Sequence, residues 1–235
     1  MEPERCREVV SSLAMRRTRS IAAALLLLAV IGSPASAHSR HHPRPTLQAA
    51  PGDFAYYVLS LSWSPQFCAT AREGDPQCSG ARRYGFVAHG LWPQYEKGWP
   101  ESCGGEALDG SLAESLLDIM PSPKLIRHEW EKHGTCSGLA AADYFRKIRE
   151  AFTGTHIPPS FTGPSAAVDT TPGDFRRALL EANPKLKADE VVLQCSGRYL
   201  QEVRVCLDKA LTPRHCASDV RDHCAGPQMI VRPVR

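Results

Sequence analysis

The sequence contains no Cys-x-x-Cys pair, although it has nine cysteines among 235 residues. This absence weighs against a structural zinc site, which commonly uses such pairs. There is also no glycine-rich phosphate loop and no internal repeat, which disfavours nucleotide-binding loops and solenoid folds. The main apolar run, Ile21–Ile31, has 11 residues and is too short to cross a bilayer comfortably.

This short apolar run is typical of a secretory signal peptide. Basic residues at Arg16-Arg17 precede it, and the small residues Ala35-Ser36-Ala37 follow it as a cleavage signal. We therefore expect residues 1–37 to be a signal peptide that is cleaved after Ala37, with Met15 a candidate for the true start. The arginine pair would also suit a twin-arginine signal, but the rest of that pattern is absent. The mature protein is then secreted or periplasmic.

The remainder divides into a short tail and one domain. Residues 38–52 are rich in His, Pro and Arg, and they predict a flexible mature N-terminus. Their histidines could bind a metal loosely, but the composition favours a disordered tail. We expect residues 53–235 to form a single catalytic domain.

The chain has almost no net charge once the signal is removed. Residues 1–37 carry five Arg and three Glu, so the mature chain keeps 23 basic and 22 acidic residues. The slightly basic whole chain is therefore no evidence for binding to nucleic acid. Cysteine is more informative, because Cys6 precedes the signal and eight cysteines follow it. An even number in an exported chain predicts disulfides formed in an oxidising compartment, although spacing alone does not choose the pairs.

Hydrophobic patterns predict an α+β fold. Strands are expected at residues 54–62, 84–91, 190–195 and 199–207 because these segments are β-branched, aromatic or alternating. Capping residues and apolar periodicity predict four helices. The expected helices cover residues 111–120, 122–134, 141–152 and 171–180.

One predicted helix carries the sequence HEWEKHGTC at residues 128–136. At about 100° per residue, four of its ionisable side chains share an arc of about 140°. These are His128, Glu129, Lys132 and His133. Trp130 should point to the core and Glu131 to solvent.

Three interpretations compete for this charged arc. A zinc-protease motif needs histidines four residues apart, whereas His128 and His133 are five apart and have a lysine beside them. Acid–base chemistry fits better, because histidine exchanges protons near neutral pH and lysine suits an anionic substrate. An ordinary solvated helix face is the third possibility. A second segment, HGLWPQ at residues 89–94, favours chemistry by placing His89 beside a glycine and a rigid Trp-Pro pair.

Together, HGLWPQ and HEWEKHGTC resemble the two marker segments of the ribonuclease T2 family. The resemblance extends more loosely from residue 54 to residue 224. It implies the family fold, a central antiparallel sheet packed with several helices and stapled by disulfides. It also implies cleavage of single-stranded RNA through a 2′,3′-cyclic phosphate to a 3′-phosphate, with no metal or cofactor.

The resemblance assigns roles residue by residue. His89 matches the general acid and His133 the general base, while His128 matches the phosphate-holding histidine. Glu129 and Lys132 match the pair that stabilises the pentacovalent phosphorane. Trp92 and Gln94 match substrate-binding positions, although many members have an acidic residue where this chain has Gln94, so we expect little base preference. The implied disulfides are Cys68–Cys78, Cys103–Cys136, Cys195–Cys224 and Cys206–Cys216.

Further expectations concern partners. RNA is the expected substrate, and DNA should not be cleaved because it lacks the 2′-hydroxyl group. We expect a monomer with no membrane contact after signal removal. Two other functions stay open: a metal-dependent phosphodiesterase that uses the same histidines, and a non-catalytic RNA-binding or inhibitory protein on the same fold.

Overall fold

The computed structural model describes residues 49–71 and 74–234. The expected signal peptide and most of the expected N-terminal tail lie outside these residues. The described end of that tail forms a turn, in which the Gly52 amide donates a hydrogen bond to the Cys136 carbonyl oxygen over 2.9 Å. This contact joins the start of the domain to the end of the HEWEKHGTC segment.

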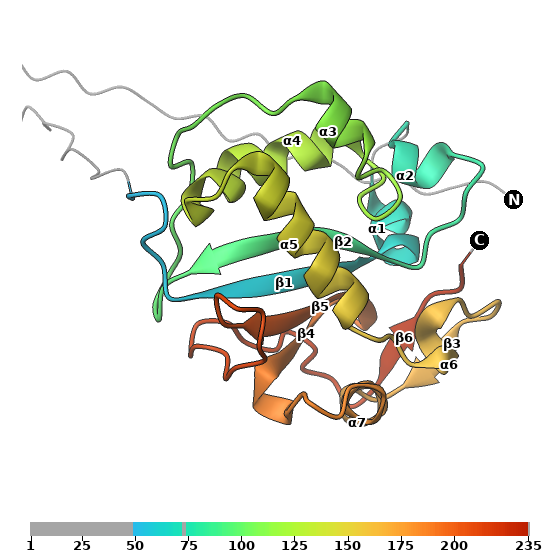
Figure 1. The fold of residues 1–235 in the computed structure, drawn as a ribbon. Helices are drawn as coiled ribbons and strands as arrows, with labels where there is room; N and C mark the ends of the chain where they lie inside the picture. The colour runs from blue at the N-terminus through green and yellow to red at the C-terminus, as the bar shows by residue number, and fades with distance from the viewer. Residues whose placement is uncertain (1–48, 72–73, 235) are drawn as a thin grey trace, which may run out of the picture. The chain divides into compact units, whose positions relative to one another are not determined.

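The described residues contain strands early and late in the chain, with helices between them (Figure 1). The strands are β1 (Tyr56–Trp63), β2 (Phe86–Gln94), β3 (Val168–Thr170), β4 (Val191–Ser196), β5 (Tyr199–Leu207) and β6 (Met229–Val231). The helices are α1 (Ser64–Thr70), α2 (Pro76–Ser79), α3 (Gly110–Glu114), α4 (Pro123–Lys132), α5 (Ala141–Gly154), α6 (Pro159–Thr162) and α7 (Pro172–Ala182). Two short 3-10 helices, η1 (Gly134–Ser137) and η2 (Ala188–Glu190), complete the set.

The strands form one sheet in the order β2-β1-β5-β6-β3, and β4 also pairs with β5. Its long pairs are antiparallel, so the predicted α+β fold with a central antiparallel sheet is confirmed. A single parallel pairing, between Tyr199 of β5 and Ile230 of β6, makes the sheet mixed. β2 is an edge strand, and β1 separates it from β5.

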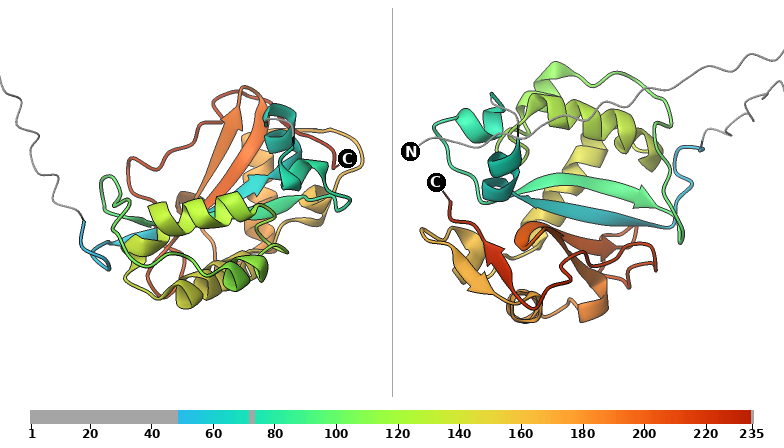
Figure 2. Two further views of the ribbon diagram at one scale, coloured as in Figure 1. Left: turned by 90° about the horizontal axis from the view of Figure 1, so that it is seen from above. Right: turned by 180° about the vertical axis from the view of Figure 1, so that it is seen from behind.

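The two faces of β1 have different partners because successive side chains of a strand point to opposite sides. Tyr57, Leu59 and Leu61 belong to the main core together with Tyr144 and Ile148 of α5. The intervening Tyr56 and Val58 pack in a second cluster with the Cys206–Cys216 disulfide. Figure 2 shows from behind the face of β1 and β2 that α5 does not cover.

Capping residues determine where the helix that carries HEWEKHGTC begins. The Ser122 hydroxyl accepts a hydrogen bond from the Leu125 amide, and Pro123 occupies the first turn of α4, as predicted. The helix expected at residues 111–120 is shorter than predicted. Asp109, rather than Ser111, caps α3, which ends at Glu114 and continues as turns.

The place of His89 also needs correction. The strand expected at residues 84–91 puts His89 near its end, but β2 continues to Gln94, so His89 lies in the middle of the strand. Upstream, Cys68 lies within α1 and Cys78 within α2. Pro65 and Pro76 occupy the first turns of these helices, where proline is well tolerated.

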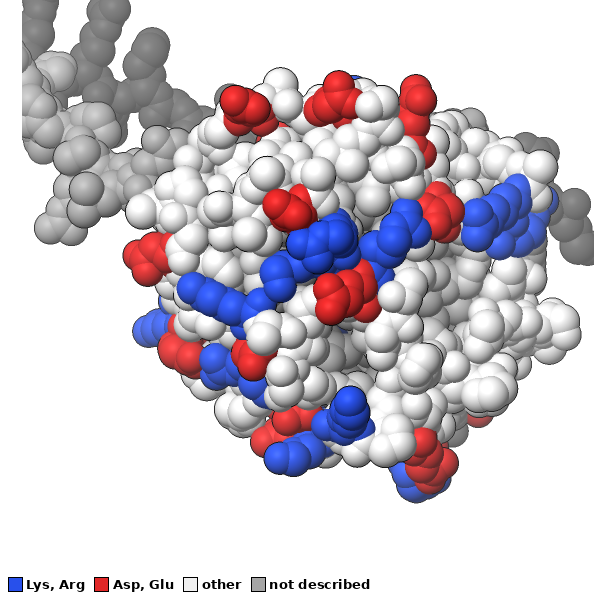
Figure 3. Space-filling model, in the orientation of Figure 1, with Lys and Arg blue, Asp and Glu red and all other residues white. Residues whose placement is uncertain are grey.

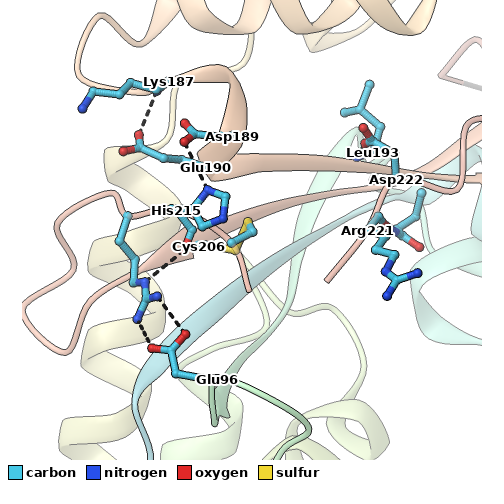
Figure 4. Close-up of a disulfide and its surroundings, with 12 residues drawn as sticks. Glu96, Lys187, Asp189, Glu190, Leu193, Cys206, His215, Arg221 and Asp222 are labelled. Atoms are coloured by element: carbon cyan, nitrogen blue, oxygen red, sulfur yellow. Dashed lines mark hydrogen bonds and ion pairs between the residues drawn. A yellow bond between two sulfur atoms is a disulfide. The ribbon is translucent and has the colours of Figure 1, made fainter. Parts of the chain in front are cut away.

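Four disulfides staple the described residues, and they are the same pairs that the resemblance implied. They join Cys68 to Cys78, Cys103 to Cys136, Cys195 to Cys224 and Cys206 to Cys216. Figure 4 shows Cys206 of the last bridge near the ion pair of His215 with Asp189. Arg214, from the same loop, forms an ion pair with Glu96. The Cys103–Cys136 bridge ties the segment after β2 to the end of the α4 region.

Removing the Cys103–Cys136 bridge should destabilise the protein more than removing Cys68–Cys78. These bridges span 33 and 10 residues. Loop-closure entropy therefore predicts losses of about 3–4 and about 2–3 kcal/mol for the respective double Cys→Ala variants. Denaturant unfolding of both variants measures the difference. Equal losses would show that strain or residual unfolded-state structure outweighs loop length.

Candidate active site

A β-bulge presents His89. Gly90 pairs with Ser60 of β1 and Ala88 pairs with the next residue, Leu61, so His89 is the extra residue in β2. Bulges bend a strand and re-aim a side chain, and they are frequent next to active sites. The His89 ring accordingly reaches across the sheet, where its Nδ1 lies 2.7 Å from Oε1 of Glu202 on β5.

The α4 region supplies four further polar side chains. His128, Glu129, Lys132 and His133 line one cavity, which confirms the arc predicted from the sequence. Trp130 is buried and donates a hydrogen bond to the Glu106 carbonyl oxygen over 2.8 Å, as its predicted core position requires. His133 caps the end of α4 and is only 8 % exposed, whereas His128 is exposed.

The cavity lies between β2, α4 and β5 and has a volume of about 390 Å³. Every residue that the sequence predicted for the site lines it, together with five that were not among the predicted site residues. Its lining consists of Val58, His89, Trp92, Gln94, Trp99, His128, Glu129, Lys132, His133, Arg204, Asp219 and Val220.

Trp92 connects the two histidine segments. Its indole N–H donates a 2.7 Å hydrogen bond to Oε2 of Glu129, which is 1 % exposed. Its ring also lies 5.4 Å from the His133 ring and beneath the guanidinium of Arg204, 5.0 Å from it. The predicted base-stacking residue is thus held by protein groups on several sides.

Gly90 and Gly134, one in each marker segment, lie so close to neighbouring side chains that no larger residue fits there. A Cβ atom at Gly90 would lie 2.0 Å from Oε2 of Glu129 and 2.5 Å from Nε1 of Trp92. A Cβ atom at Gly134 would lie 2.4 Å from the Trp130 ring and 2.8 Å from the Tyr144 ring. Any side chain at position 90 would therefore occupy the space of the Trp92–Glu129 hydrogen bond.

Different neighbouring charges separate the pKa values of the two central histidines. For His133, burial together with the charges of Lys132, His128 and His89 lowers the pKa to about 3. For His89, burial acts in the same direction, but the hydrogen bond and charge of Glu202 and the charge of Glu129 outweigh it and raise the pKa. Near neutral pH, the His133 ring is therefore neutral, whereas the carboxylates beside His89 stabilise its protonated form. Opposed shifts of this kind are typical of an acid–base pair.

The two buried glutamates are also different. Burial raises the pKa of Glu129 to about 7, although His89 and Trp92 oppose the shift. Burial would raise the pKa of Glu202 too, but contacts with His89 and Arg204 prevail and lower it to about 2. Glu202 is therefore a permanent carboxylate near neutral pH, whereas Glu129 can carry a proton.

Sequence reasoning missed Glu202 and Arg204. They alternate with Val203 and Val205 along β5, a pattern that usually marks the solvent-facing side of a strand. No motif distinguishes them, and only strand order brings them opposite His89. Asp219, Val220 and Trp99 also line the cavity, and Trp99 is 55 % exposed at its edge.

Gln94 lines the same cavity, but it is buried and its amide N–H donates to the Pro93 carbonyl oxygen over 3.0 Å. Within residues 49–71 and 74–234, no three His, Cys, Asp or Glu side chains are grouped so that they could hold a metal ion. The His128 and His133 rings lie 6.5 Å apart, nearly perpendicular to one another.

Comparison with known proteins identifies the family. The sequence model of the Ribonuclease T2 family matches residues 54–216, which include every cavity-lining residue except Asp219 and Val220. The chain belongs to the ribonuclease T2 family. As a T2-type endoribonuclease, it acts on RNA.

Individual relatives agree with this assignment. The chain is 37 % identical over 191 residues to a ribonuclease of Aeromonas hydrophila, covering 78 % of this chain and 88 % of the relative. It is 35 % identical over 187 residues to a probable ribonuclease of Haemophilus influenzae, covering 73 % and 64 % respectively. Ribonuclease MC1 from bitter gourd seeds has a similar structure, with a TM-score of 0.61 and 25 % identity over 75 % of this chain and 99 % of that one.

Replacing Gly90 with alanine should disrupt the T2 site. The new methyl group would displace Glu129 or Trp92, so we expect activity on RNA to fall by about 10²-fold or more. Such overpacking should also cost about 1–3 kcal/mol of stability. Initial-rate assays and thermal unfolding measure both effects. Gly154→Ala is the matched control because nothing lies within 4 Å of its Cβ position. Full activity in Gly90→Ala would contradict the close approach described here.

Proposed function

We propose that this protein is a secreted or periplasmic endoribonuclease that cleaves single-stranded RNA without a metal ion. The reaction is transphosphorylation to a 2′,3′-cyclic phosphate, followed by hydrolysis to a 3′-phosphate. The observation that carries this proposal is the pair of histidines in one cavity, His133 with a lowered pKa and His89 with a raised one. A neutral base and a protonated acid are the two groups that this reaction needs.

In the proposed first step, neutral His133 takes the proton of the 2′-hydroxyl group. The 2′-oxygen attacks the adjacent phosphorus, and His89 donates its proton to the leaving 5′-oxygen. His128 and Lys132 hold the phosphate, and Lys132 with Glu129 stabilises the charge of the phosphorane. DNA is not a substrate because it has no 2′-hydroxyl group.

The same roles reverse in the second step. His89, now neutral, accepts a proton from water, and the water oxygen attacks the cyclic phosphate. His133 returns its proton to the 2′-oxygen, which leaves as a hydroxyl group. The histidines are then restored to their starting forms.

Little base preference follows from the proposed binding residues. Gln94 is buried and its amide is engaged by the Pro93 carbonyl, which supports weak readout of a base edge at this position. Trp92 offers an aromatic surface for stacking, which tolerates any base. In the related ribonuclease MC1, a variant has been solved in complex with 5′-UMP. Because Trp92 and Gln94 line the same cavity as the histidines, we propose that a base lies near them.

Export and assembly form the remaining part of the proposal. Four disulfides in the described residues support maturation in an oxidising compartment, after cleavage of residues 1–37. Among the described residues, no helix is both long and apolar enough to pass through a membrane. Basic and acidic side chains alternate over the face in Figure 3, without a broad surface of one sign. We propose a monomeric catalytic domain over residues 53–235.

A timed digest of a short RNA in excess EDTA tests the chemistry. We expect cyclic phosphate ends first and 3′-phosphate ends later, as identified by mass spectrometry. Cleavage that needs an added divalent ion would instead favour a metal-dependent phosphodiesterase. No cleavage under either condition would favour a non-catalytic RNA-binding protein.

The variant His133→Ala should lose activity by about 10²–10⁴-fold, the usual contribution of a general base. Its thermal midpoint should change little, because the Nδ1 atom of His133 is buried without a hydrogen-bond partner. His223→Ala is the control, since His223 is exposed and does not line the cavity. Surviving activity in His133→Ala would remove His133 from the role of base.

Activity should be highest at mildly acidic pH. His133 must be neutral, which holds above its pKa of about 3, and a protonated Glu129 is expected to donate to a phosphate oxygen below its pKa of about 7. The rate should therefore decline as pH rises through about 7. Glu129→Gln keeps a neutral donor, so it should retain more activity than Glu129→Ala and lose the part of this decline that Glu129 causes. Deprotonation of His89, the proposed acid, should still lower the rate above its raised pKa. A pH–rate profile that is unchanged in Glu129→Gln would assign the alkaline limb to another group.

A further inference from the structure

Glu202 is a buried carboxylate outside both marker segments, yet it contacts a residue of the proposed chemistry. It is 5 % exposed, and its two oxygens have different partners. Oε1 lies 2.7 Å from Nδ1 of His89. Oε2 accepts from Nε and Nη2 of Arg204, over 2.9 and 2.6 Å. Both carboxylate oxygens are therefore engaged, and the side chain is held in one orientation.

The sheet makes this contact possible across an intervening strand. Ser60 of β1 pairs with Gly90 of β2 on one side and with Arg204 of β5 on the other. Ser62 likewise lies between Val87 and Glu202. Both β1 residues at these positions have small side chains, and His89, the bulged residue, contacts Glu202 across this strand.

Resting on the proposed function, we propose that Glu202 is a positioning residue that holds the His89 ring with Nδ1–H toward the sheet and Nε2 toward the substrate. A neutral imidazole carries its proton on either nitrogen, and a fixed acceptor at Nδ1 selects one form. After His89 gives its Nε2 proton to the leaving oxygen, the Nδ1 proton stays on the ring and remains bonded to Glu202. The Nε2 lone pair is then ready to accept the proton of water in the second step.

The other charged groups around His89 are consistent with this assignment. Oε1 of Glu129, from α4, lies 3.7 Å from Nε2, on the side that faces the cavity. Arg204 neutralises Glu202 from β5, and the positive charge of His89 in turn helps to keep His133 neutral. Glu202 and Glu129 thus contact opposite nitrogens of one ring, and only Glu202 acts from outside the substrate space.

Leaving-group dependence distinguishes positioning from general structural support. A dinucleotide has a poor leaving oxygen that needs protonation, whereas the 4-nitrophenyl ester of uridine 3′-phosphate does not. We expect Glu202→Gln to slow dinucleotide cleavage by about 10-fold or more in kcat, and to slow the ester much less. The KM should change little, because Glu202 does not line the cavity.

A matched control is Glu190→Gln. Glu190 is also buried, accepts from the Lys187 amide over 2.8 Å (Figure 4) and does not line the cavity. Both substrates should be cleaved normally by this variant. Should Glu202→Gln unfold by leaving Arg204 unpaired, the double variant Glu202→Gln/Arg204→Gln removes both charges and should show the same substrate pattern.

His89→Ala separates failure of this inference from failure of the proposed function. If His89→Ala slowed dinucleotide cleavage selectively and Glu202→Gln did not, the role of Glu202 alone would be overturned. If His89→Ala slowed the cleavage of both substrates equally, the assignment of His89 as the acid would be overturned. NMR titration of the His89 ring nitrogens gives an independent readout, and we expect its pKa to fall in Glu202→Gln. An unchanged pKa and an unchanged tautomer would also overturn the inference.

Discussion

The hydrogen bond from the Trp92 indole to the buried Glu129 carboxylate joins the two segments on which the site depends. One segment is an edge strand and the other is a helix, and they come from distant parts of the chain. Gly90 lets the carboxylate approach the strand, and Gly134 lets the end of the helical segment pack on Trp130 and Tyr144. If the strand and helix separated, His89 and His133 would no longer face one cavity.

At this junction, different partners give buried side chains of the same type opposite pKa shifts. His133 loses hydration and faces positive groups, so its neutral form is favoured. His89 is held between two carboxylates, which outweigh its burial. The same contrast divides the glutamates, since Glu202 has an arginine partner and Glu129 has a tryptophan and a histidine. Partners, rather than residue type, therefore decide which group carries a proton.

Much of the local structure could be predicted from the sequence because its causes are local. The Ser122-Pro123 cap and the spacing of Glu129 and Trp130 depend on helix geometry alone. α5 and α7 followed from apolar periodicity and, for α7, from the cap at Thr171. The predicted start of α3 was wrong because the helix is capped by Asp109 rather than by Ser111. β3 and β6 were missed because three residues are too few to show a strand pattern.

By itself, the sequence determined which ionisable side chains of the helical segment share one face, since residues on one helix have fixed angular positions. It also determined the family, through two motifs whose residue types are specific. The tertiary structure alone decided that Glu202 and Arg204 belong to the site. Their place depends on β1 lying between β2 and β5 and on a bulge at His89. Strand order and register arise from packing of the whole sheet, so no local pattern in β5 could reveal them.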